Sequence, residues 1–167
     1  YHNDTQVIIS VLSSDEENPY DALGIVGSSI ALAVSDIPFR DPVGACVIGL
    51  IDDELIVNPT YEQLQESKLD LTVAGTEDAI MMVESGSKFV SEEILLDALK
   101  LAQEVNGKIV RFIKEIVDEV GKSKWEIDEN DDSLEDLKQQ INSSYLEDLK
   151  KIVRSKDNKT EKSEKYN

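Results

Sequence analysis

The sequence predicts an α+β fold in which helices back a sheet, followed by a helical appendage. Three observations lead to this class. Short β-branched and apolar runs, typical of buried strands, alternate with polar turn segments through most of the first 90 positions. A long stretch from Ser91 repeats apolar residues at helical spacing, and a second such stripe begins at Leu134. Strand pairs followed by a long helix are typical of a helix-backed sheet.

A strand and a helix are expected first. Residues 6–12 are apolar and β-branched, which predicts a buried strand. Asn18-Pro19 then breaks the chain and suits the start of a buried helix over residues 22–34. Gly24 and Gly27 each cost this helix about 1 kcal/mol relative to alanine. Close packing of its small residues against a sheet is the expected compensation.

Two strand pairs are expected in the middle of the chain. Asp52-Asp53 suits the hairpin turn of the first pair, and Gly75 lies between the strands of the second. Thr60 and Gln63 fit a capping box, which predicts a short helix between the pairs. Met81-Met82 is expected to pack in the core. The predicted strands cover residues 43–50, 55–57, 69–74 and 79–83.

A long helix packed on one face is expected next. Ser91 is its N-cap candidate, and Glu92 and Glu93 lie in the first turn, where carboxylates favour the helix dipole. Apolar residues then recur at helical spacing up to Ile116. Asn106-Gly107 is a candidate interruption of this helix.

Four parts are expected along the chain. Residues 1–120 form the α+β part, and residues 121–132, which contain the only tryptophan, form a linker. Residues 133–154 carry a second apolar stripe, interpreted as a helix-bundle face because its polar side is mixed in sign and does not suit a membrane surface. Residues 155–167 have too few apolar side chains for a packed core and are expected to be disordered.

The charge argues against independent nucleic-acid binding. The net charge is −18, and residues 1–116 hold 21 acidic against 7 basic side chains, a balance of −14. Surfaces that bind nucleic acid strongly are usually basic, because neutralising phosphates drives that binding. The acidity is therefore interpreted as a solvated surface.

Cysteine content and hydropathy favour an intracellular protein. Cys46 is the only cysteine, which excludes an internal disulfide and a thiolate metal cluster. No apolar run reaches the roughly 18 residues of a membrane helix, and nothing resembles a signal peptide. The expected location is the cytoplasm. Because the chain begins at Tyr1 without a methionine, it is interpreted as an internal fragment.

Residue types that often carry chemistry are sparse. His2, the only histidine, would have to serve any Ser-His-Asp or Cys-His arrangement, and it is interpreted as an ordinary exposed histidine. Asp15-Glu16-Glu17 could hold a hard cation, but such runs are more often solvated loops. Gly24 and Gly27 have the wrong spacing for a phosphate-binding loop. The residues alone therefore predict no catalytic, cofactor-binding or metal site.

An ordered series of stretches resembles the first core of the polynucleotide phosphorylase family. One of them, residues 69–79, reads LDLTVAGTEDA. No single stretch is diagnostic, but their order and gaps match the family through about residue 116. The linker with Trp125 and the helix after it more loosely resemble the start of the family's all-helical domain. The matching stretches cover residues 3–8, 11–13, 27–39, 42–45, 49–52, 57–60, 69–79, 82–84 and 90–93.

The resemblance implies an RNase PH-like fold, an incomplete helix-backed mixed sheet followed by an α-helical segment. It also implies part of a phosphorolytic 3′–5′ exoribonuclease, or polyribonucleotide nucleotidyltransferase, that degrades RNA, including mRNA. In this family inorganic phosphate attacks the terminal phosphodiester with the assistance of magnesium, and nucleoside diphosphates leave. The enzyme is a homotrimer around an RNA channel, and each full chain has two such cores.

The resemblance further implies that this core is not the catalytic one. In the family's second core a serine-rich turn cradles phosphate, whereas the matching turn here, Pro19-Tyr20-Asp21, has no serine and adds a carboxylate that repels phosphate. Asp70 is the only retained match to the two metal carboxylates. Leu64 stands at the other position, and Glu66 is near but out of register. The implied role is to build the trimer and line its channel, without catalytic or metal-binding residues here.

Two alternatives stay open. The chain could be a non-catalytic RNase PH-like assembly or binding module, in which case a stop codon would soon follow Asn167. It could also be an unrelated acidic α+β protein, which leaves the ordered matches unexplained. If strands before Tyr1 normally pair with these, open sheet edges remain, and the chain is expected to self-associate or to be marginally stable.

Overall fold

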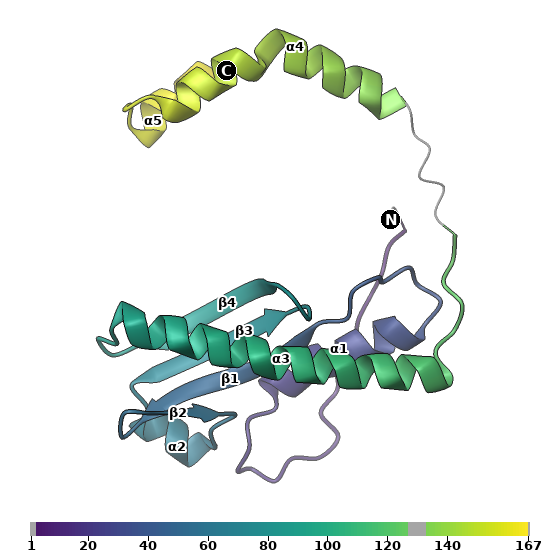
Figure 1. Ribbon diagram of the computed structural model, residues 1–167, viewed down its shortest axis with the longest axis vertical. Helices are drawn as coiled ribbons and strands as arrows, with labels where there is room; N and C mark the ends of the chain where they lie inside the picture. The colour runs from purple at the N-terminus through teal and green to yellow at the C-terminus, as the bar shows by residue number, and fades with distance from the viewer. Residues whose placement is uncertain (1–2, 127–132, 167) are drawn as a thin grey trace. The chain divides into compact units, whose positions relative to one another are not determined.

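A computed structural model of the chain describes residues 3–126 and 133–166 and divides into two compact units, Tyr1–Glu126 and Ile127–Asn167 (Figure 1). His2 lies outside the described residues. Among the helices that are described, none combines the length and the apolar character needed to cross a bilayer.

The first unit contains one four-stranded sheet. Its strands are β1 (Gly44–Ile51), β2 (Glu54–Val57), β3 (Leu69–Gly75) and β4 (Ile80–Ser87), in the spatial order β2-β1-β3-β4. The three described pairings are all antiparallel, where a mixed sheet was expected. The α+β class is confirmed, and the four strands predicted between residues 43 and 83 are present at their places in the chain.

The two predicted local signals between the strands are confirmed. Asp52 and Asp53 adopt φ values of 50° and 63°, the left-handed conformation that a two-residue hairpin turn requires at both positions. Thr60 begins α2 (Tyr61–Glu66) with a complete capping box. The Thr60 Oγ1 atom accepts from the Gln63 amide at 3.3 Å, and Gln63 Oε1 accepts from the Thr60 amide at 2.9 Å.

One face of the sheet is covered by the long helix α3 (Glu92–Val120) (Figure 1). The helix begins as predicted, with Ser91 Oγ accepting from the Ile94 amide at 3.4 Å. Asn106-Gly107 does not interrupt it, because both residues are buried where the helix approaches β1. The core on this face consists of Cys46, Ile48, Leu50, Leu69, Leu71, Val73, Ala98 and Ala102.

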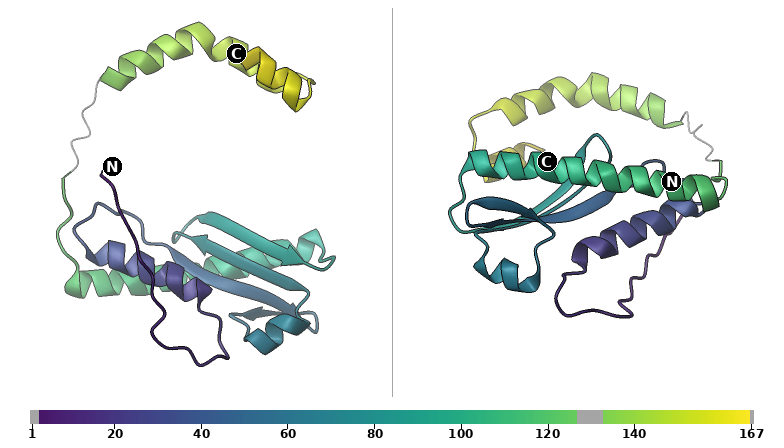
Figure 2. Two further views of the ribbon diagram at one scale, coloured as in Figure 1. Left: turned by 180° about the vertical axis from the view of Figure 1, so that it is seen from behind. Right: turned by 60° about the horizontal axis from the view of Figure 1, so that its bottom comes forward.

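The opposite face carries α1 (Asp21–Val34) and α2 (Figure 2, right). A smaller core lies here, formed by Ala22 of α1 with Ala45, Val47 and Ala74 of the sheet. Residues of β1 and β3 therefore alternate between two cores, one on each face. The predicted helix over residues 22–34 is confirmed.

Strand β4 is exposed along its whole length. Met81 is 68% exposed and Met82 37%, so the expectation that they pack in the core is wrong. The reason is their position on the edge strand, beyond the area that the helices cover. Side chains that alternate along an edge strand are buried only where a second layer reaches them.

The predicted strand at residues 6–12 is also wrong. This segment is exposed, and none of the described strands pairs with it. Its apolar side chains lie beside α1 instead, where an added Cβ at Gly24 would lie 3.7 Å from Cδ1 of Ile9. The small residues of α1 therefore face this segment, and an open cavity of about 600 Å³ lies between the two.

A strap of residues 121–126 closes the C-terminal end of α1. The Lys124 ammonium donates to the carbonyl oxygens of Leu32, Ala33 and Ser35 at 3.1, 2.7 and 2.7 Å. The amide of Lys122 donates to Val34, and that of Trp125 donates to Asp36. A cation at this end of a helix also complements the helix dipole.

The second unit contains α4 (Ser133–Arg154) and α5 (Lys159–Tyr166). Helix α4 confirms the helix predicted over residues 133–154. Helix α5 lies in the segment expected to be disordered, and a capping box stabilises its start. Asn158 Oδ1 accepts from the Glu161 amide, and Glu161 Oε2 accepts from the Asn158 amide, both at 3.0 Å.

Candidate functional site

A cleft of about 660 Å³ opens on the face of the sheet that carries α1 and α2. It collects side chains from both helices and from strands β1, β3 and β4. Asp70 and Leu64, the two positions singled out from the sequence, both line it, whereas Glu66 does not. The other lining residues are Pro19, Asp21, Ile25, Val47, Tyr61, Thr72, Met82, Glu84, Ser85 and Gly86.

Asp70 is exposed on the central strand β3 between two glycines. Its cross-strand neighbours are Gly49 on β1 and Gly86 on β4. Neither glycine has a side chain that could cover the Asp70 carboxylate. No hydrogen bond or ion pair found in the described part of the chain engages its carboxylate. The carboxylate is left available to solvent in the cleft.

Leu64 lies on α2 and packs against the small core of this face. It is half-buried against apolar residues and offers no ligand atom to a metal ion. Within residues 3–126 and 133–166, no group of three or more His, Cys, Asp or Glu is placed to hold a metal ion. Of the two positions that the resemblance assigns to metal carboxylates, Asp70 supplies a carboxylate and Leu64 does not.

The N-terminus of α1 forms one end of the cleft. Asp21 occupies the first turn of this helix, and no side chain caps it. Amide groups at a helix N-terminus attract anions, but here a carboxylate already occupies that position. No lysine, arginine or histidine is among the lining residues, whereas Asp21, Asp70 and Glu84 are. The cleft is therefore negatively charged.

Tyr61, which lines the same cleft, has a phenol with a raised pKa. Partial burial raises the pKa of its phenol above the ordinary value, and the negative charges of Asp21 and Asp15, together with Tyr20, raise it further. The phenol therefore stays protonated at neutral pH. It can donate a hydrogen bond in the cleft but cannot serve there as a base.

The acidic run at residues 15–17 organises the loop before α1. The Asp15 carboxylate accepts from the Asn18 amide at 2.9 Å, from the Asn18 side chain at 2.6 Å and from the Glu17 amide at 3.0 Å. These hydrogen bonds, those from Asn18 first, lower the pKa of Asp15 to about 2. Loop formation accounts for this carboxylate without a bound cation.

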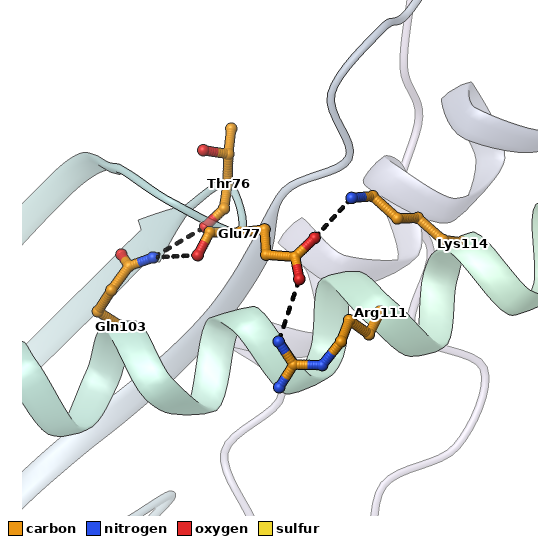
Figure 3. Close-up of polar contacts among 5 residues, drawn as sticks. All are labelled: Thr76, Glu77, Gln103, Arg111 and Lys114. Carbon is orange, nitrogen blue, oxygen red and sulfur yellow. Dashed lines mark hydrogen bonds and ion pairs between the residues drawn. The ribbon is translucent and has the colours of Figure 1, made fainter.

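A polar cluster that the sequence did not single out fixes the turn between β3 and β4 (Figure 3). Glu77 accepts from Arg111 at 3.1 Å and from Lys114 at 2.6 Å, both on α3. Gln103 of the same helix donates to the carbonyl oxygens of Thr76 and Glu77 at 3.1 and 2.8 Å. Helix α3 thereby holds the turn that joins β3 and β4, two of the strands that line the cleft.

Replacing Glu77 with glutamine is expected to lower the melting temperature at pH 7. Hydrogen bonds from Lys114 and then Arg111 hold the pKa of this carboxyl below its ordinary value of 4.5. The charged form therefore contributes stability above pH 4.5, and this contribution is lost as the pH falls through the lowered pKa. Thermal unfolding of the unchanged chain and of Glu77→Gln between pH 3 and 7 measures this contribution to stability.

Glu104→Gln is the matched control for Glu77→Gln. Glu104 is an exposed carboxylate on α3 for which the described residues provide no ion pair. Its replacement should leave the melting temperature nearly unchanged at every pH. Equal effects of the two substitutions would show that the Glu77 cluster does not stabilise the fold.

Relatives of known name match most of the chain. The profile of the 3′ exoribonuclease family, domain 2, matches residues 41–105. The chain is 49% identical over 157 residues to a polyribonucleotide nucleotidyltransferase of Finegoldia magna. This alignment covers 94% of the chain and 22% of the relative. The enzyme of the same name from Caldicellulosiruptor bescii is 48% identical over 141 residues, and the alignment covers 84% of this chain and 20% of that relative. The chain thus spans about a fifth of the length of these relatives.

Solved structures show the same fold. Rice Rrp46 aligns with a TM-score of 0.55 at 16% identity, over 61% of this chain and 49% of its own. Cell-death-related nuclease 5 of C. elegans aligns with a TM-score of 0.53 at 23% identity, over 62% of this chain and 58% of its own. At these identities the likeness shows the fold alone, which confirms the RNase PH-like class. The family resemblance is confirmed as well: residues 41–105 are a domain of the 3′ exoribonuclease family, in a chain whose relatives are polyribonucleotide nucleotidyltransferases.

Proposed function

We propose that this chain is part of a phosphorolytic 3′–5′ exoribonuclease that degrades RNA, and that it forms a non-catalytic core of that enzyme. Its relatives are named polyribonucleotide nucleotidyltransferases, which supports the parent activity. In this proposal the complete enzyme acts on RNA and inorganic phosphate in the cytoplasm. It is a homotrimer whose magnesium lies in another core.

The negative charge of the Asp70 cleft carries the non-catalytic part of the proposal. Phosphorolysis requires the enzyme to hold an anionic phosphate beside the anionic backbone of RNA, which takes hydrogen-bond donors and positive charge. Asp21, Asp70 and Glu84 line the cleft without a basic partner among its lining residues. Like charges in such a site disfavour phosphate binding, and Leu64 removes the second metal ligand.

What remains for this core is structural. Two clusters of buried apolar side chains, one on each face of the sheet, make this unit a rigid body. Such a body can support neighbouring parts of a longer enzyme. The cleft lacks basic side chains among its lining residues, and phosphate binding needs positive charge. We therefore assign the chain to building the trimer and lining its RNA channel.

A phosphorolysis assay on the purified chain tests the proposal. With labelled poly(A), phosphate and magnesium, the chain should release ADP at least about 10³-fold more slowly than the full-length relative from Finegoldia magna, because both the phosphate donors and a metal ligand are absent. Isothermal titration with inorganic phosphate should show no binding.

ADP release that disappears in Asp70→Asn but persists in Asp78→Asn would overturn the non-catalytic assignment. Asp78 is a suitable control because it is an exposed carboxylate that does not line the cleft. Absence of phosphorolysis in the complete parent protein as well would overturn the enzyme assignment. It would favour a purely assembling RNase PH-like module.

A further inference from the structure

The strap of residues 121–126 is held in place by hydrogen bonds and not by burial. All six of its residues are exposed, and none of them belongs to either apolar core. Trp125, the only tryptophan of the chain, is 50% exposed. Segments that bury few apolar side chains open at a lower free energy than the core of the same protein. The strap therefore differs from helix α3 before it, which packs against the sheet.

Helix α1 receives most of its C-terminal capping from this strap. Its C-cap residue, Ser35, is extended, with a φ of −74° and a ψ of 174°, and no basic residue lies in its last turn. The left-handed residue that ends many helices and satisfies their last carbonyl groups is therefore missing here. Ser35 Oγ donates to the carbonyl oxygen of Leu32 at 2.8 Å, and the carbonyl oxygens of Ala33 and Ser35 accept from Lys124.

The Lys124 ammonium matches the carbonyl groups at this end of α1 in number. An ammonium has three N–H donors and no acceptor, and its three acceptors here lie at 3.1, 2.7 and 2.7 Å. Hydrogen bonds from a charged donor are stronger than those from a neutral one. The backbone hydrogen bonds of Lys122 and Trp125, at 3.0 and 2.9 Å, lie on either side of Lys124. Loss of the ammonium therefore removes the central and strongest contact of the strap.

We propose that the strap opens and closes on α1 as one unit while the sheet and its two cores stay folded, and that the charge of Lys124 keeps it closed. In the closed state the chain is bound to α1 immediately before the second unit begins at Ile127. In the open state this attachment is lost. The strap is then a conformational switch at the junction of the two units, and one charge sets its state. The inference does not depend on the proposed function, because it rests on contacts made within the first unit.

Hydrogen exchange of single amides, followed by NMR, tests whether the strap opens separately from the core. In the unchanged chain, exchange at Lys122 and Trp125 should be independent of urea below the unfolding transition, because local opening exposes little surface. Exchange at Leu71, which is fully buried in β3, should accelerate with urea over the same range, because its amide is released only when the sheet unfolds.

Lys124→Met tests the role of the charge. Methionine keeps a flexible, unbranched side chain but cannot donate a hydrogen bond. Exchange at Lys122 and Trp125 should become at least about 10-fold faster, while exchange at Leu71 stays unchanged. Lys124→Arg keeps the charge and the donors, and should exchange at rates closer to those of the unchanged chain. Acrylamide should quench the fluorescence of Trp125 more strongly in Lys124→Met than in Lys124→Arg.

Lys122→Met is the matched control, because it removes a charge from the same strap. Among the described residues, no hydrogen bond or ion pair is found for the Lys122 side chain, and the substitution keeps the backbone amide that donates to Val34. Exchange rates should stay within about 2-fold of those of the unchanged chain.

Three results would overturn the proposal. Exchange at Trp125 could accelerate with urea in parallel with exchange at Leu71, which would make the strap part of the cooperative core. Lys124→Met could leave exchange at Trp125 unchanged, which would show that the ammonium does not hold the strap closed. Lys122→Met could also accelerate this exchange as much as Lys124→Met does, which would assign the effect to charge in general and not to the contacts of Lys124.

Discussion

Leu71→Ala is expected to lower the free energy of unfolding by about 2–5 kcal/mol. Leu71 lies in the centre of β3 opposite Ile48 of β1, is fully buried and packs in the core beneath α3. Truncation removes the buried methyl groups and leaves a cavity that strands held on both sides cannot close. Urea unfolding monitored by circular dichroism measures the change.

Met81→Ala is the matched control for this substitution. It also shortens a large apolar side chain on a strand of the same sheet, but this side chain is 68% exposed. We expect a change within about 0.5 kcal/mol. If Leu71→Ala were equally mild, the core between α3 and the sheet would not be the main source of stability.

Gly44→Ala is expected to destabilise the fold by about 1–3 kcal/mol although it adds only one methyl group. That methyl group would lie 2.7 Å from the carbonyl oxygen of Asn106 and 3.0 Å from its Cα atom. Both are backbone atoms of α3, so relief requires a movement of the helix and not of a flexible side chain. The same denaturation experiment measures the loss.

Gly86→Ala tests whether the close approach is the cause. Gly86 also lies in a strand, and an added Cβ there meets no atom within 4 Å. The expected change is within about 0.5 kcal/mol. A similar loss at both positions would point to a general effect of removing glycine from the sheet, and not to contact with Asn106.

Local signals in this chain predicted local structure well. The aspartate pair predicted the hairpin turn, and Thr60 and Ser91 predicted the starts of two helices, because each signal is satisfied by atoms a few residues away. The helix at residues 159–166 carried the same kind of signal, from Asn158 to Glu161. Its polar composition had favoured disorder instead.

The errors about strands have a different origin. Residues 6–12 and Met81-Met82 have the composition of buried strands, but burial depends on whether another layer reaches them. No pattern within a strand reveals whether it lies at an edge. Periodicity therefore identified the strands of the sheet without identifying which residues its helices cover.

The candidate site was predicted in part. The family resemblance drew attention to Asp70, Leu64 and the turn at Asp21, and the fold brings all three to one cleft. Tyr61 and Glu84 were missed, because they come from α2 and β4 and reach the cleft only through the strand register. The Glu77 cluster was missed for the same reason, since its partners are 34 and 37 residues away along the chain.

The strap that closes α1 has a consequence for the order of events in folding. The last carbonyl groups of α1 are bound by Lys124, up to 92 residues later in the chain. Closing a loop of that length precedes any gain from those contacts, and a chain made on the ribosome exposes α1 long before Lys124 emerges. Helix α1, which precedes Lys124 in the chain, is therefore among the last elements to complete its native hydrogen bonds.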